Sequence, residues 1–147
     1  MAEPRLDPTR ALVLSLKPRF AEAILNGTKT LELRRVMPRI TIPTLALLYA
    51  TGPARSLVGT CIVHSVIRLP VDELWQRHGT KTALSRPEFD AYLSGRSEGV
   101  ALFLKQPNRL PAPIPLQALR LADNFRPPQS LAYVDPGRRE RLVTALQ

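Results

Sequence analysis

Apolar and polar residues follow one another along the chain in short stretches that predict short strands and short helices. Ala11–Leu16 and Thr44–Ala50 are almost continuously apolar, which is typical of buried strands. Leu57–Ile67 is a third apolar stretch, in which a bend is expected, and Val100–Lys105 alternates in the manner of a half-buried strand. Several short strands mixed with short helices predict an α+β fold.

Helices are predicted where apolar residues recur every three to four positions. Residues 18–26 begin with a proline at the first helical position and end at Gly27, where a left-handed C-terminal cap is favoured. Another helix is expected to begin after Ser85, because Ser85 and Glu88 have the spacing of a capping box. Further helices are expected at Val71–Arg77, Leu116–Leu121 and Pro136–Gln147.

The 147 residues are long enough for one domain with a core of its own. Residues 1–10 are polar and predict a flexible leader, 11–134 form the predicted domain, and 135–147 are expected to form a basic C-terminal helix or tail. The proline-rich stretch Pro107–Pro115 is unsuited to a central strand or a helix interior. It is therefore expected to be a surface connection or a sheet edge.

Charged residues are concentrated on one predicted strand, Thr30–Val36. From Thr30 on, apolar residues occupy every second position, which is the spacing of a strand and not of a helix. Glu32 and Arg34 share one face of this strand. Lys29 precedes them in a turn that we expect to be reachable by solvent. Two interpretations remain open, a binding site or a solvated strand face on which Glu32 and Arg34 pair. The side chains expected to point toward the core are Leu31, Leu33 and Val36.

The motif Gly27-x-Lys29-x-x-Glu32-x-Arg34 resembles the signature of the ASCH domain, a branch of the PUA-like superfamily. The resemblance covers residues 11–134 and implies a PUA-like β-barrel with short flanking helices. It is closest to the bacterial and archaeal single-domain members. The other segments that resemble these members are Leu14–Pro18, Tyr49–Pro53 and Phe125–Ser130.

The resemblance implies a ligand cleft between the barrel and the helix at 18–26, and RNA, another nucleic acid or a nucleotide-like molecule as the ligand. Lysine would supply a point charge, arginine a planar fork, and a carboxylate an acceptor for base N–H groups. Tyr49 is a candidate for stacking on a base, although it also ends a buried strand. The candidate binding residues are Ser15, Lys17, Lys29, Glu32, Arg34, Arg35, Tyr49 and Thr51.

Charge also favours a polyanionic partner, because 21 basic residues face 12 acidic ones and the net charge is +9. The alternative is a compositional bias toward arginine. Cys61 is the single cysteine and is expected to be a buried structural thiol. No metal or cofactor is expected, since His64 and His78 lack ligand spacing to a carboxylate pair. The sequence shows no signal peptide or membrane span, so a cytoplasmic protein is expected, and its oligomeric state is left open.

Enzymatic alternatives would use Lys29 and Glu32. Superfamily members that hydrolyse an acetylated cytidine carry a threonine three residues after the lysine, whereas this chain has Glu32 there. They also use a distant glutamate, and the loop at 79–84, where it would be expected, contains no acidic residue. Such an amidohydrolase would need exchanged roles, with Thr82 facing Glu32. A metal-independent ribonuclease is the second enzymatic alternative. A regulatory module that binds protein through the Pro107–Pro115 stretch is a third interpretation.

Overall fold

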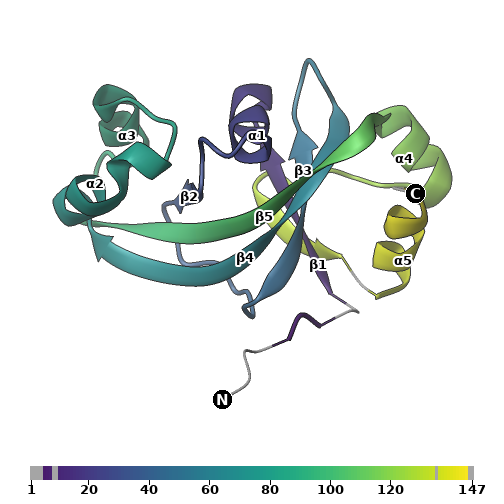
Figure 1. Cartoon of the computed structure of the whole chain (residues 1–147), viewed down its shortest axis with the longest axis horizontal. Coiled ribbons are helices and arrows are strands. Elements are labelled where there is room, and N and C mark those ends of the chain that lie inside the picture. The colour runs from purple at the N-terminus through teal and green to yellow at the C-terminus, as the bar shows by residue number, and fades with distance from the viewer. Residues whose placement is uncertain (1–4, 8–9, 135, 146–147) are drawn as a thin grey trace.

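The computed structural model describes residues 5–7, 10–134 and 136–145. The predicted leader at 1–10 falls mostly outside these residues, as do positions 135 and 146–147 of the predicted C-terminal segment. The described residues form one six-stranded sheet, with helices packed against it (Figure 1). The strands are β1 Ala11–Leu16, β2 Leu31–Arg34, β3 Thr44–Ala50, β4 Ser56–Pro70, β5 Glu98–Pro115 and β6 Leu131–Val134. The helices are α1 Pro18–Leu25, α2 Val71–His78, α3 Arg86–Tyr92, α4 Leu116–Asp123 and α5 Pro136–Ala145, with a 3₁₀ turn at Gly79–Lys81.

The strand order is β2-β5-β4-β3-β1-β6, with β1 and β3 parallel and the other pairs antiparallel. The two end strands, β2 and β6, do not pair with each other within the described residues, so the sheet is open. The closed or nearly closed barrel that the resemblance implied is therefore not confirmed, whereas the mixture of strands and helices is. Each end strand has only four residues and is paired along one side.

Side chains pack on both faces of the sheet. Successive residues of β1 point to opposite sides and therefore belong to different clusters. Leu12 and Leu14 pack on one side in a cluster that includes Ile24 of α1. Ala11 and Val13 pack on the other side, in a cluster that receives side chains from α4 and α5. A third cluster holds α2 and α3 against β2 and β5. The first face, which carries α1, is the one that forms the site described below.

The motif strand is shorter than the sequence predicted. Leu31 and Leu33 are buried as expected, and Gly27 has the positive φ of 86° that the cap requires. Val36, however, is 63% exposed, so its predicted core position is wrong. The physical reason is that β2 ends at Arg34, after which alternation no longer places side chains on fixed faces.

The proline-rich stretch is the second half of strand β5 and not a connection. It pairs with β4 as far as Ser56 and Pro115, while β2 pairs only with residues 100–103 of β5. Among the described residues, no strand pairs with the other side of this half, as expected for an edge. Gly59 of β4 lies beneath α1, where an added Cβ would be 2.4 Å from a methyl group of Leu25 and 2.6 Å from the Asn108 carbonyl oxygen.

Candidate functional site

A cavity of about 370 Å³ opens between α1, β2 and α3, and we call it the cleft. It lies beside the charged motif strand, where the resemblance placed a ligand. The candidate residues that line it are Ser15, Lys17, Lys29, Glu32 and Arg34. The candidates that do not line it are Arg35, Tyr49 and Thr51.

Several cleft residues were not among the sequence candidates, because their helical spacing is also that of core residues. Phe20 of α1 and Tyr92 of α3 are half-buried and form aromatic parts of the wall. Arg19 forms an ion pair with Glu88, which joins α1 to α3 beside the cleft. The Glu88 pKa is lowered to about 2, chiefly by a backbone hydrogen bond from Ser85 and then by Arg19. Nothing in the local sequence distinguishes Phe20 and Tyr92 from core residues.

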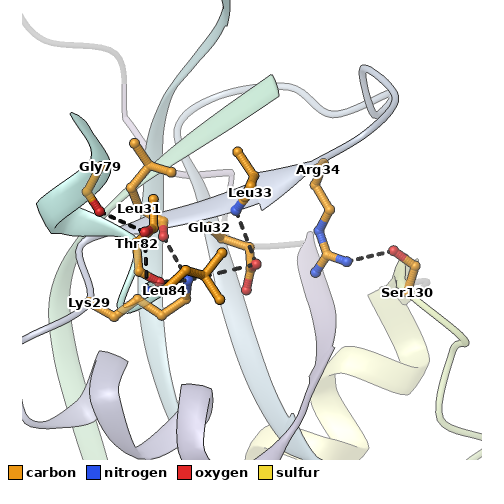
Figure 2. A network of polar contacts seen from close by, with 9 residues as sticks. All are labelled: Lys29, Leu31, Glu32, Leu33, Arg34, Gly79, Thr82, Leu84 and Ser130. Carbon is orange, nitrogen blue, oxygen red and sulfur yellow. Dashed lines mark hydrogen bonds and ion pairs between the residues drawn. The ribbon is translucent and has the colours of Figure 1, made fainter. Parts of the chain in front are cut away.

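Lys29 is buried, with 3% of its surface exposed, so the predicted solvent-reachable lysine is wrong. Its ammonium Nζ donates to the carbonyl oxygens of Leu31 at 2.9 Å and Thr82 at 2.7 Å (Figure 2). The turn after α2 covers it, since the Thr30 N–H donates to the Lys81 carbonyl. Burial lowers the Lys29 pKa from its usual value, partly offset by the negative charge of Glu32. Two backbone carbonyls thus hold the Lys29 side chain at the floor of the cleft.

Glu32 is 8% exposed, and its two carboxylate oxygens have different surroundings. Oε1 accepts from the Leu33 backbone N–H at 3.1 Å and lies 3.9 Å from Lys29 Nζ. Oε2 is buried and has no hydrogen-bond partner within the described chain. The ion pair with Arg34 that the sequence left open is not formed, and Lys29 is the ionic partner of Glu32 instead.

Arg34 extends toward the segment before β6, as Figure 2 shows. Its Nη1 donates to Ser130 Oγ at 2.8 Å, while Nε and Nη2 are buried and meet no acceptor in hydrogen-bond geometry among the described residues. Ser15 fixes this segment, because its Oγ donates to the Pro128 carbonyl at 2.6 Å and its N–H to the Ser130 carbonyl at 2.9 Å. The cleft thus contains unused N–H donors and one unused carboxylate oxygen. Buried polar atoms without partners are rare in proteins and fit a ligand that completes them.

The remaining candidates lie outside the cleft. Tyr49 is 3% exposed and packs against Phe125 with ring centroids 5.9 Å apart, in the cluster on the opposite face of the sheet. Burial raises the Tyr49 pKa. Thr51 donates its N–H to the Leu16 carbonyl at 2.8 Å and holds the end of β3. Arg35 is exposed and lies 4.6 Å from the Tyr92 ring centroid.

The hydroxyl that the amidohydrolase alternative requires is already bonded. Thr82 is buried, and its Oγ1 donates to the Gly79 carbonyl at 2.7 Å and accepts from the Leu84 N–H at 3.2 Å. Cys61 is buried as predicted, and burial, aided by the charge of Glu32, raises its pKa to about 12. Within the described ranges, no group of three or more His, Cys, Asp or Glu side chains is placed to hold a metal ion. None of the described helices is both long and apolar enough to cross a membrane.

Comparison with known proteins assigns the chain to a family. The sequence profile of the ASCH domain matches residues 14–109. An ASCH domain-containing ribonuclease of Zymomonas mobilis is 36% identical over 135 residues, which cover 90% of this chain and 89% of that protein. The crystal structure of ASCH from Zymomonas mobilis has a TM-score of 0.87, at 33% identity, and covers 94% of this chain and 96% of that one. The N-terminal domain of Staphylothermus marinus McrB, at 10% identity, has a TM-score of 0.57 over 91% of this chain and 93% of its own, which shows a shared fold only. The chain therefore belongs to the ASCH domain family.

Proposed function

We propose that this protein is a ribonuclease that binds RNA in the cleft and cleaves it there. The observation that carries the proposal is the set of unused polar atoms in the cleft: Nε and Nη2 of Arg34 and Oε2 of Glu32. A phosphodiester offers acceptor oxygens to the arginine, and a ribose hydroxyl offers a donor to the carboxylate. The relative named as a ribonuclease, at 36% identity, supports RNA as the substrate.

Arg34 is suited to the phosphate because its Nε and Nη2 form the planar fork that binds two oxygens of one anion. Its Nη1 is held by Ser130, so the fork is oriented before the ligand arrives. Fixed donors aimed at a phosphate stabilise the charge that develops during displacement at phosphorus. Arg34 is thus the proposed residue for transition-state stabilisation.

Glu32 is the proposed general base. Its Oε2 would accept the proton of the ribose 2′-hydroxyl while the 2′-oxygen attacks the adjacent phosphorus. The bond from phosphorus to the 5′-oxygen then breaks, and that oxygen takes a proton from water. The products are a 2′,3′-cyclic phosphate and a 5′-hydroxyl. Lys29, 3.9 Å from Oε1, is not a catalytic residue in this scheme, and its positive charge holds the carboxylate in place.

The aromatic walls of the cleft favour an unpaired base. Phe20 and Tyr92 are half-buried, with Arg19 lying 4.3 Å from the Phe20 ring centroid and Arg35 4.6 Å from that of Tyr92. A base that is not stacked in a duplex can stack on such arginine–ring pairs. Burial raises the Tyr92 pKa, while the charges of Arg34 and Arg35, and the closeness of the Arg34 guanidinium to the Tyr92 hydroxyl, lower it to a smaller extent. Single-stranded RNA is therefore the proposed substrate. A cytoplasmic location remains a prediction from the sequence, which subcellular fractionation would test.

The test uses a fluorescent single-stranded RNA, with binding measured by fluorescence anisotropy and cleavage by denaturing gel electrophoresis. Arg34→Gln should weaken binding by one to two decades, since a hydrogen bond to a charged group contributes about 1.5–3 kcal/mol. Glu32→Gln should leave binding within a few-fold and abolish the 2′,3′-cyclic product. Arg77→Gln is the matched control, because Arg77 is an exposed arginine of α2 that lies outside the cleft and pairs with Glu73. A parent protein that neither binds nor cleaves RNA, or an Arg34→Gln variant that behaves like Arg77→Gln, would refute the proposal.

A further inference from the structure

Two more cavities continue from the cleft along the end of β2. The middle cavity, of about 360 Å³, shares Arg34 and Tyr92 with the cleft. The distal cavity, of about 230 Å³, shares Arg35, Val36 and Met37 with the middle one. The three cavities therefore adjoin one another in a row that leads from the cleft to the end of β4 and the start of β5.

Arginines without protein partners line the far end of this row. Arg68 of β4 and Arg96, in the turn before β5, line the distal cavity together with Arg35. The guanidinium groups of Arg68 and Arg96 form no hydrogen bond or ion pair with any described residue, and both side chains are exposed. Glu98 is the one carboxylate among the lining residues, so three positive charges face one negative charge. This end of the row therefore has a net positive charge, and the guanidinium groups of Arg68 and Arg96 are not engaged by other described residues.

Elsewhere on the surface, several arginines form ion pairs with nearby carboxylates, whereas Arg39, Arg55, Arg120 and Arg126 form none among the described residues. The ion pairs are Arg10–Asp7, Arg19–Glu88, Arg77–Glu73, Arg86–Asp90, Arg109–Glu22 and Arg141–Asp123. Because acidic residues are placed beside these arginines, the distal cavity keeps part of the excess positive charge of the whole chain. A strand of phosphates that leaves the cleft would meet this charge directly.

The middle cavity connects the two ends in a way that suits a nucleotide. Its lining includes Tyr92, over which Arg35 lies at 4.6 Å, with Arg35 Nε donating to the Tyr92 carbonyl at 2.7 Å. A cation and an aromatic ring held together in this way form a flat wall on which a base can stack. Ser130 and Leu131 also line this cavity.

We propose that the protein binds a single RNA strand along all three cavities, with one nucleotide in the cleft, the next in the middle cavity, and a phosphate of the continuing strand held by Arg35, Arg68 and Arg96 in the distal cavity. This inference rests on the proposed function, because it extends the same site. It specifies the substrate class as single-stranded oligonucleotides longer than a dinucleotide. A mononucleotide would fill only the first position.

The test measures anisotropy with a labelled series of oligouridylates from mononucleotide to octanucleotide, at several salt concentrations, with RNA integrity checked on gels. For the parent, affinity should rise with length beyond the dinucleotide. In the double variant Arg68→Gln/Arg96→Gln, the gain in affinity with length should fall by about tenfold or more, since two arginine contacts to the phosphate in the distal cavity are lost. The slope of log affinity against log salt should shrink by roughly 0.7, the value for one neutralised phosphate on a single strand. Mononucleotide binding should not change.

The matched control is Arg109→Gln/Arg120→Gln, which removes the same charge from exposed sites on β5 and α4. It should keep the length dependence of the parent. If the double variant at Arg68 and Arg96 has the affinities and salt slope of this control, the extended path is wrong while the cleft proposal stands. If the parent binds none of the oligonucleotides, the proposed function itself fails. An equal affinity for oligodeoxyuridylates would overturn the assignment to RNA.

Discussion

Replacing Lys29 with methionine should destabilise the fold strongly, because this side chain is a buried cation with three partners. Lys29→Met keeps the length of the side chain and removes the ammonium group. The carbonyl oxygens of Leu31 and Thr82 then lose a donor, and Glu32 loses the one ionic partner that it has among the described residues. Breaking a buried ion pair by deleting one partner costs about 3–5 kcal/mol. Apolar contact of the methionine with Phe20 restores part of this stability, so we expect the free energy of unfolding to fall by about 3 kcal/mol.

Urea unfolding, with the slope m compared between variants, measures this loss directly. For a chain of this size, about 3 kcal/mol corresponds to a fall in Tm of roughly 6–12 °C. The double variant Lys29→Met/Glu32→Gln should be more stable than Lys29→Met alone, because no lone carboxylate is left in the cleft floor. A Lys29→Met protein within about 0.5 kcal/mol of the parent would refute the structural role, since that is the range of surface substitutions.

Three further predictions follow from the site and its surroundings. The Glu88 pKa of about 2 lies below its ordinary 4.5, so the stabilising contribution of this carboxylate is present above pH 4.5 and is lost as the pH falls through 2. Glu88→Gln should flatten this part of the curve of stability against pH, as measured by urea unfolding. The Cys61 thiol, buried and with a pKa near 12, should react with iodoacetamide only after urea is added, as followed by mass spectrometry, and rapid labelling of the native protein would contradict its burial. Ser130→Ala frees Nη1 of Arg34, so RNA cleavage should fall by about tenfold with little change in Tm, and unchanged cleavage would show that Ser130 does not orient the guanidinium.

Local sequence signals were sufficient for the elements they control. The capping box of Ser85 and Glu88 forms as expected, and the apolar stretches Ala11–Leu16 and Thr44–Ala50 are strands with those bounds. These features depend on residues close in the chain or on continuous burial. The same reasoning placed the end of the first helix at Gly27.

The details of the cleft depend on contacts between distant residues, which local patterns do not encode. Thr82, whose carbonyl binds the Lys29 ammonium, is 53 residues away along the chain, and Ser130 is 96 residues from Arg34. A lysine in a turn is normally solvated, so its burial under the segment after α2 could not be read from residues 27–34 alone. Arg68 likewise lines the same cavity as Arg35 because the pairing of β4 with β5 places it there.

The open sheet has a consequence for how the protein remains dispersed. Unpaired edge strands expose backbone groups that can pair with a strand of another molecule. Here β2 and β6 are short, and Arg34 and Arg35 stand at the end of β2, so copies of a chain with net charge +9 repel one another at this edge. A bound polyanion would cancel that repulsion while leaving the edges in place. We therefore expect turbidity to pass through a maximum when RNA phosphates balance the protein charge, and the solution to clear again in excess RNA.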